Sequence, residues 1–131
     1  MKYALILFLI YSIESKADES GGCDAGGAHE YSVNCLSAKY TSAKTNLTKA
    51  YKGTIERARE EDAWNEKNGR TSNFLELTKK SQRAWKEYVN SYCELYGSTL
   101  ASSSWGGVRM DECRINHFER RVYELNGILG G

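Results

Sequence analysis

Residues 36–58 read LSAKYTSAKTNLTKAYKGTIERA, and this stretch decides the fold class. Apolar side chains recur in it at steps of three and four residues, the repeat of one face of an α-helix. The positions are Leu36, Tyr40, Ala43, Leu47, Tyr51, Ile55 and Ala58. The 131-residue chain contains no proline, so nothing fixes φ or removes a backbone donor within this pattern. We therefore predict a long helix from about Tyr31 to Lys67, which Asn68-Gly69 ends.

Two further helical patterns follow. The second begins at Asn73, whose side chain can form a capping box with Glu76, and Gly97 ends it. The apolar stripe of this second pattern is Leu77, Ser81, Trp85, Tyr88, Tyr92 and Leu95. The third begins near Asp111, and its stripe is Phe118, Val122, Leu125 and Leu129. Strand-type alternation is not sustained anywhere. The sequence therefore predicts an all-α fold, a disulfide-stapled bundle of three antiparallel helices after a short N-terminal segment.

The first residues predict export. Lys2, an apolar run over residues 4–13 and the small residues around Ser15-Lys16-Ala17 form the pattern of a secretory signal. An apolar run of about ten residues is too short for the roughly 20 that a spanning helix needs. We expect residues 1–17 to be removed, and the domain of residues 18–131 to be secreted or periplasmic with no stable membrane insertion.

The charge balance bears on the class of partner. Removal of residues 1–17 takes Lys2, Lys16 and Glu14 from 18 basic and 17 acidic residues, which leaves 16 of each. A domain without net charge has no overall field to attract nucleic acid or an anionic membrane surface. We expect a protein partner and no nucleic acid.

Four cysteines remain after removal of the signal: Cys23, Cys35, Cys93 and Cys113. An even number in a short exported chain favours two disulfides. A zinc site is less favoured because no C-x-x-C pair is present. A cysteine nucleophile would need His29 or His117 as its base. We therefore expect disulfides, with no metal ion and no cofactor.

The order of the helices predicts how the cysteines pair. If the second helix runs back along the first, the first two cysteines lie at the same end of the bundle as the last two. We therefore predict two long-range disulfides, each joining Cys23 or Cys35 to Cys93 or Cys113, and both such pairings remain open. Long-range bonds would restrict the unfolded chain by about 4 kcal/mol each in the entropic model. One difficulty is that Cys35 lies about eleven residues further from the Asn68-Gly69 turn than Cys93, roughly 16 Å along a helix.

The segment from Gly97 to Val108 is the longest predicted connection. It contains Trp105 among small residues, and a tryptophan there either plugs the core or is an exposed contact anchor. Burial is favoured, because tryptophan is highly buried on average. The exposed alternative makes Trp105, Gly106 and Gly107 the candidate partner contact.

Several segments resemble motifs of one family of exported bacterial proteins. The family has a helix with the motif Y-x-x-A-D-x-x-L-N-x-x-Y, which Tyr40, Ala43, Leu47 and Tyr51 resemble. It also has a segment with the motif Q-R-A-W-x-x-F-R-D-x-x-C, which Gln82-Arg83-Ala84-Trp85 resembles together with Tyr88 and Cys93. Its closing motif R-x-x-x-L is matched by Arg121 and Leu125. Gly106-Gly107 is similar to the family's Gly-Gly-Ser turn, and Cys23 and Cys35 to its opening cysteine pair. Over residues 23–126 the chain thus resembles the LprI-type lysozyme-inhibitor domain. The resemblance gives Tyr40, Leu47, Tyr51, Gln82, Trp85 and Arg121 structural roles.

The resemblance implies a binding protein. Such an inhibitor would block a lysozyme-type muramidase by occupying its sugar cleft and covering the two carboxylates there. The alternative is a non-inhibitory extracytoplasmic interaction module with another partner. An enzyme is disfavoured. Glu56 and Glu60 lie one helical turn apart, but no nucleophile, buried base or metal set accompanies them in the sequence.

Overall fold

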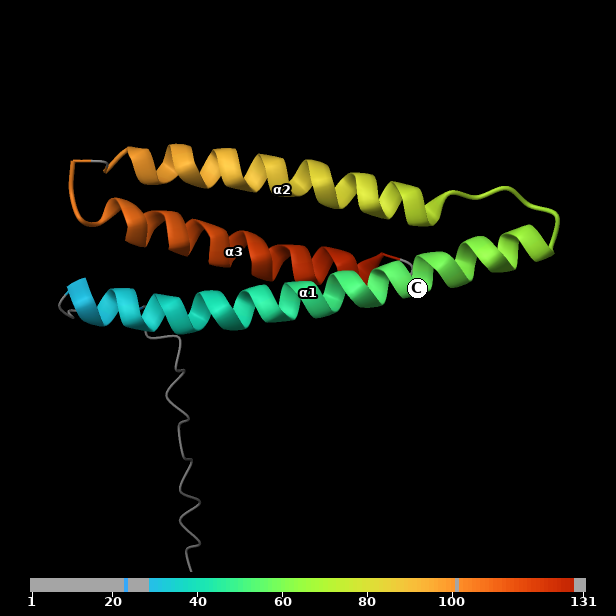
Figure 1. Cartoon of the computed structure of the whole chain (residues 1–131), viewed down its shortest axis with the longest axis horizontal. Helices are drawn as coiled ribbons and strands as arrows, with labels where there is room; N and C mark the ends of the chain where they lie inside the picture. Colours follow the sequence, from blue (N-terminus) through green and yellow to red (C-terminus); the bar gives the residue numbers. More distant parts are fainter. Residues whose placement is uncertain (1–22, 24–28, 101, 129–131) are drawn as a thin grey trace, which may run out of the picture.

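The structure is a computed structural model that describes Cys23, residues 29–100 and residues 102–128. It contains three helices, α1 (His29–Lys67), α2 (Phe74–Ser98) and α3 (Gly106–Gly127), which run up, down and up (Figure 1). The described residues contain no strand, so the predicted all-α bundle is confirmed. No helix among them is long and apolar enough to cross a membrane. The expected signal segment, residues 1–17, lies outside the described residues.

Helix α1 buries the face that the sequence predicts. Of the seven stripe positions, Leu36, Ala43, Leu47 and Ala58 are buried and the others are partly buried. The helix ends at Lys67 as predicted, and Gly69 in the turn after it has a φ of 69°, which favours glycine. The N–H of Arg70 then donates to the carbonyl of Asn65 at 2.8 Å, which satisfies one of the last carbonyls of α1.

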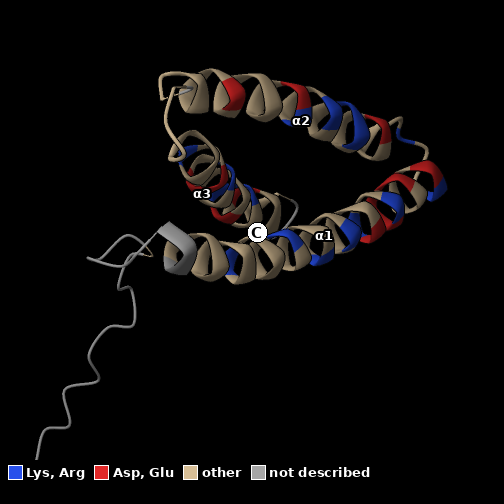
Figure 2. Cartoon of the chain, turned by 60° about the vertical axis from the view of Figure 1, so that its left-hand side comes forward, with Lys and Arg blue, Asp and Glu red and all other residues tan. Residues whose placement is uncertain are grey.

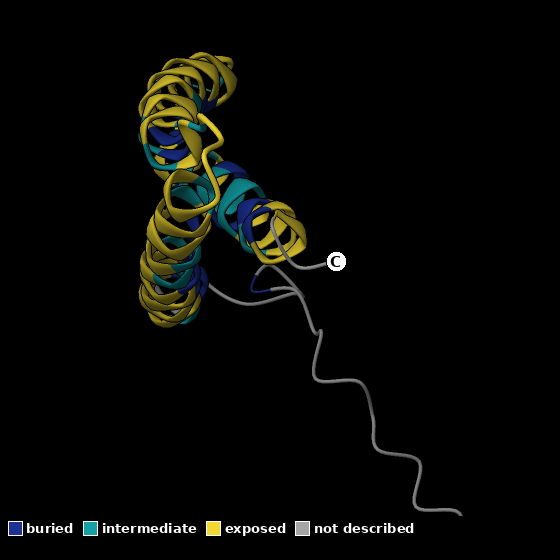
Figure 3. Ribbon diagram, turned by 90° about the vertical axis from the view of Figure 1, so that its right-hand side faces the viewer, coloured by how far each residue is buried: buried dark blue, intermediate teal, exposed yellow. Residues whose placement is uncertain are grey.

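Helix α3 packs along both other helices, and Phe118 lies at the centre of the core. Phe118 contacts three apolar clusters: one around Leu36 and Ile115, one around Leu47 and Leu125, and one around the Cys93–Cys113 bond. The buried residues lie on the sides where the helices face one another (Figure 3).

Helix α3 begins at Gly106, five residues before the predicted start at Asp111. Two glycines allow this early start. A Cβ on Gly97 would lie 2.9 Å from the carbonyl oxygen of Gly106, and a Cβ on Gly106 would lie 3.1 Å from that of Gly97. The two backbones therefore approach closely at these positions, and the connection is shorter than predicted. Leu129, which we placed on the third stripe, lies outside the described residues.

The prediction of which side of α2 is buried is wrong: most of the buried positions lie one residue after those of the predicted apolar stripe. Helix α2 buries Thr78, Gln82, Val89, Cys93 and Gly97, and Trp85 is partly buried. The predicted positions Leu77, Tyr88, Tyr92 and Leu95 are exposed, as is Ser81. The disulfide of Cys93 and the hydrogen bond of Gln82 both reach α3, so they turn this side of α2 inward at the expense of the more apolar side.

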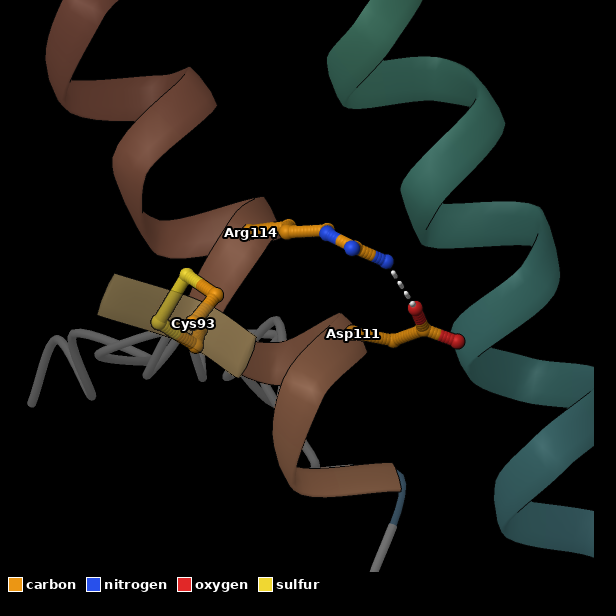
Figure 4. Close-up of a disulfide and its surroundings, with 4 residues drawn as sticks. Cys93, Asp111 and Arg114 are labelled. Carbon is orange, nitrogen blue, oxygen red and sulfur yellow. Dashed lines mark ion pairs between the residues drawn. A yellow bond between two sulfur atoms is a disulfide. The ribbon is translucent and has the colours of Figure 1, made fainter. Parts of the chain in front are cut away.

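All four cysteines form disulfides, but the predicted long-range pairing is wrong. Cys23 pairs with Cys35, with 5.6 Å between their Cα atoms, and Cys93 pairs with Cys113 at 5.5 Å. The early start of α3 explains the second bond, because it places Cys113 two turns into α3 and opposite Cys93. Figure 4 shows this bond, beside which Arg114 and Asp111 of α3 form an ion pair at 3.7 Å. The first bond joins Cys35 of α1 to Cys23, which precedes that helix in the chain.

Candidate functional site

The family-motif residues of α2 and α3 meet around Arg121. The Arg121 residue is 7% exposed and its guanidinium donates to Gln82 Oε1 at 3.1 Å, Ser81 Oγ at 2.8 Å and Glu124 Oε2 at 3.0 Å. It also lies over the ring of Trp85, with its central carbon 5.6 Å from the ring centroid. The buried charge is thus hydrogen-bonded on three sides, and the cluster joins α2 to α3.

The motif residues of α1 also face the core. The Tyr40 ring lies 5.4 Å from that of Phe118, and Leu47 packs with Leu125. Tyr51 packs against the same cluster as Leu47. The structure therefore turns all six motif residues toward the core, where Leu47, Gln82 and Arg121 are buried and the other three are partly buried.

The candidate contact from the sequence lies at the connection between α2 and α3. Trp105 is 37% exposed, so the prediction that it plugs the core is wrong. It directly precedes α3 at the end of the bundle, where no helix covers it fully. Gly106 is buried against the backbone of Gly97 and cannot reach a partner, whereas Gly107 is exposed.

Beside this end lies a groove of about 590 Å³, which we call the tyrosine groove. Tyr88, Tyr92 and Tyr96 line one wall from successive turns of α2, with ring centroids 5.6 and 6.4 Å apart. His117 of α3 lies edge-on to the first two rings, at 5.8 and 5.5 Å. The sequence assigned Tyr88 and Tyr92 to the core, but the rotation of α2 turns them toward this groove.

Basic groups predominate in the tyrosine groove. Lys39, Arg109 and Arg120 line it with one acidic residue, Glu112, which pairs with Arg109 at 3.7 Å. Burial, together with the positive charge of Arg120, holds the pKa of His117 below its usual value. Because three basic side chains face one acidic side chain, the groove suits a ligand with negative groups.

His117 also lies close to the Cys93–Cys113 bond, and one ring nitrogen and the two sulfur atoms all lie within 4.8 Å of one another. Histidine and cysteine are residue types that bind zinc, but a cysteine binds zinc as its thiolate. Both sulfur atoms form the disulfide in this structure, so the cluster offers no thiolate ligand.

The other end of the bundle is a projecting pair of helix ends, residues 59–77, which we call the tip. Helix α3 ends against the middle of α1, where Thr54 and Arg57 each donate to the carbonyl of Leu125 at 3.1 Å. Helix α1 continues beyond this point for about ten more residues, roughly 15 Å (Figure 1). No residue of the tip is buried.

Hydrogen bonds order the tip in place of a core. The predicted capping box is absent, because the side chain of Asn73 makes no capping bond. The carboxylate of Asp62 caps α2 instead: it accepts from Ser72 Oγ at 2.6 Å and from the N–H groups of Phe74 and Leu75 at 2.9 Å. The hydroxyl of Ser72 and these two N–H groups hold the pKa of Asp62 below its usual value. The turn is therefore tied back to α1.

The tip presents apolar and cationic groups to solvent. Trp64 is 52% exposed, and the guanidinium carbon of Arg70 lies 5.4 Å from the centroid of its ring. Phe74 and Leu77, one turn apart on α2, are also exposed. Figure 2 shows charged residues gathered where α1 ends and α2 begins. From the sequence, Asn68-Gly69 predicts only a helix stop; the signal for an exposed surface is an aromatic residue and an arginine on either side of that turn.

Comparison with known families places this architecture. The family model described as "Lysozyme inhibitor LprI" matches residues 23–125. The chain belongs to the LprI family. No curated protein and no solved structure matches it. The predicted resemblance is thereby confirmed, and the family is one of inhibitors and not of enzymes.

Most of the family-motif residues and the candidate binding surfaces lie in different parts of the domain. The six residues with expected structural roles lie toward the interior around Arg121 and Phe118, whereas Tyr88 and Cys23 of the motifs line the tyrosine groove and the tip contains none of the motif residues. Glu56 and Glu60, the acidic pair considered for catalysis, are both exposed on α1.

Proposed function

We propose that this LprI-family protein inhibits a lysozyme-type muramidase outside the cytoplasm, by occupying the substrate cleft of that enzyme. The family match over residues 23–125 is the observation on which the proposal rests. Two disulfides fit an oxidising compartment, and the signal pattern of residues 1–17 accounts for export to it.

The shape of the domain supports occupation of a cleft. A muramidase cuts its glycan between two carboxyl groups that lie in a cleft. A projecting element that is already ordered can fill such a cleft with little loss of conformational freedom. The tip has these properties, because it extends past α3 and Asp62 fixes its turn.

The charge balance bears on the range of targets. A domain without net charge gains little from long-range attraction, so shape and local hydrogen bonds would determine which muramidase it binds. We expect affinity to depend only weakly on the net charge of the muramidase.

The tyrosine groove favours a second candidate function, that of a non-inhibitory interaction module. Its basic residues and tyrosine hydroxyls would receive an acidic segment of another extracytoplasmic protein. This function predicts binding without any loss of muramidase activity.

A titration distinguishes the two functions. Oxidised protein of residues 18–131 is added to a panel of basic and acidic muramidases, and the clearing of a cell-wall suspension is followed. We expect at least one enzyme to lose its activity at near-stoichiometric inhibitor, while a neutral helical protein of similar size has no effect. Full activity of every enzyme at a hundredfold excess of the protein would contradict the proposed inhibition.

A further inference from the structure

We infer that the tip is the element that enters the muramidase cleft, with Arg70 facing the catalytic carboxylates and Trp64 lining the sugar-binding surface. This inference rests on the proposed function and names the surface that performs it.

The first step is geometric. A cleft is filled by a convex element, and the tip is the part of the described chain that extends beyond the three-helix core (Figure 1). The core ends at Ala58 on α1 and Thr78 on α2, and no residue between them is buried. The tyrosine groove, by contrast, is concave, so it can receive a segment but cannot fill a cleft.

The second step concerns order. An exposed turn between two helix ends would ordinarily lose much conformational freedom on binding. Here Asp62 binds Ser72 and two N–H groups of α2, and Arg70 N–H binds the carbonyl of Asn65. The turn is thus held at both ends, and the entropic cost of binding is lowered.

The third step is charge complementarity. The apex of the tip, residues 67–74, reads KNGRTSNF, and it contains two basic residues and no acidic one. Within the described chain neither Lys67 nor Arg70 has an ion-pair partner. Asp62 lies behind the apex, with its oxygens occupied by Ser72 and the start of α2. The tip as a whole, residues 59–77, has five acidic and three basic residues, so the positive charge that would face the two carboxylates of the cleft is confined to Lys67 and Arg70 at the apex.

The fourth step concerns residue type. The planar guanidinium of Arg70 can donate two parallel hydrogen bonds to one carboxylate, which an ammonium group cannot. Its position over the ring of Trp64 presents the cation and the aromatic surface together. Tryptophan and arginine are also the side chains that most often dominate binding energy at interfaces.

The test compares tip variants with groove variants in the same inhibition assay. Arg70→Ala and Trp64→Ala alter the tip, Tyr92→Ala alters the tyrosine groove, and Lys80→Ala is a control for loss of one exposed basic residue of α2. All four side chains are exposed, so we expect each variant to keep the thermal unfolding temperature and helical circular dichroism of the wild type.

We expect Arg70→Ala to raise the inhibition constant by about 30-fold or more, the effect of removing one partner of a desolvated charge pair. Trp64→Ala should raise it at least tenfold, Arg70→Lys should restore only part of the loss, and Lys80→Ala and Tyr92→Ala should change it less than threefold. Unchanged inhibition by both tip variants, or loss of inhibition in Tyr92→Ala alone, would overturn this inference and leave the proposed function standing. A wild-type protein that inhibits no muramidase would overturn both.

Discussion

The Arg121 cluster offers the sharpest test of how the fold is held together. We predict that Arg121→Ala lowers the free energy of unfolding by about 3–5 kcal/mol. The Gln82 residue is only 5% exposed, and its amide oxygen would lose its hydrogen-bond donor. A buried acceptor without a donor costs about 1–3 kcal/mol. The bond to Ser81 and the contact with Trp85 add about 1 kcal/mol each. Glu124 is half-exposed, so its ion pair adds little.

The measurement is urea denaturation followed by circular dichroism at 222 nm. Arg120→Ala is the matched control, because Arg120 is the neighbouring arginine on α3 but is exposed, and it should change stability by less than about 0.5 kcal/mol. A cycle with Gln82→Ala should show a coupling of about 1 kcal/mol or more between the two sites. A loss below about 1 kcal/mol for Arg121→Ala, or no coupling, would refute the structural role of the cluster.

Three further predictions concern the backbone approach, the cap and the disulfides. Gly97→Ala should destabilise the protein by about 1–3 kcal/mol, because the new Cβ would lie 2.9 Å from a backbone oxygen. Gly107→Ala is the control in the same denaturation assay. A Cβ on Gly107 would have no atom within 4 Å, so this variant should be neutral or stabilising by up to about 1 kcal/mol. Asp62→Asn should lower the melting temperature at pH 7. Because the folded pKa of Asp62 is depressed, its contribution is present above the unfolded pKa and is lost as the pH falls through the folded pKa. The difference between wild type and variant should therefore shrink in acid, and a constant difference would contradict the cap. Non-reducing peptide mapping should recover Cys23–Cys35 and Cys93–Cys113 peptides, and a peptide joining Cys35 to Cys93 would contradict the structure. Replacement of both Cys93 and Cys113 by serine should lower the free energy of unfolding by about 3 kcal/mol, the value expected for a loop of 20 residues.

The long helix α1 could be predicted from the sequence because its stripe is regular and its end is chemically marked. Leu36, Ala43, Leu47 and Ala58 recur at helical spacing, and Gly69 permits the backbone that ends the helix. The six motif residues lie toward the core for a related reason, since each motif is a set of side chains at helical spacing.

The orientation of α2 could not be predicted in the same way. Its most apolar side contains Leu77, Tyr88 and Leu95, and periodicity assigns that side to the core. The disulfide at Cys93 and the polar contact of Gln82 with Arg121 turn the helix, and both depend on contacts distant in sequence. Hydrophobic periodicity contains no information about such partners.

The disulfide pairing and the tip were missed because both depend on where helices begin and end. The close approach of Gly97 and Gly106 starts α3 early, which brings Cys113 opposite Cys93. The tip projects because α3 ends while α1 continues, and relative helix length in space is not evident from sequence periods. Sequence periodicity therefore does not indicate that Trp64 and Arg70 lie on a projecting turn.

Steady-state kinetics with a soluble oligosaccharide substrate tests most directly whether the protein occupies the substrate cleft. A muramidase that the protein inhibits is assayed over a range of substrate concentrations at several fixed inhibitor concentrations. Occupation of the cleft by the tip predicts competitive inhibition, in which the apparent KM rises in proportion to inhibitor and kcat stays constant. A fall in kcat with KM unchanged would mean that the inhibitor and the substrate bind together, and it would contradict the account.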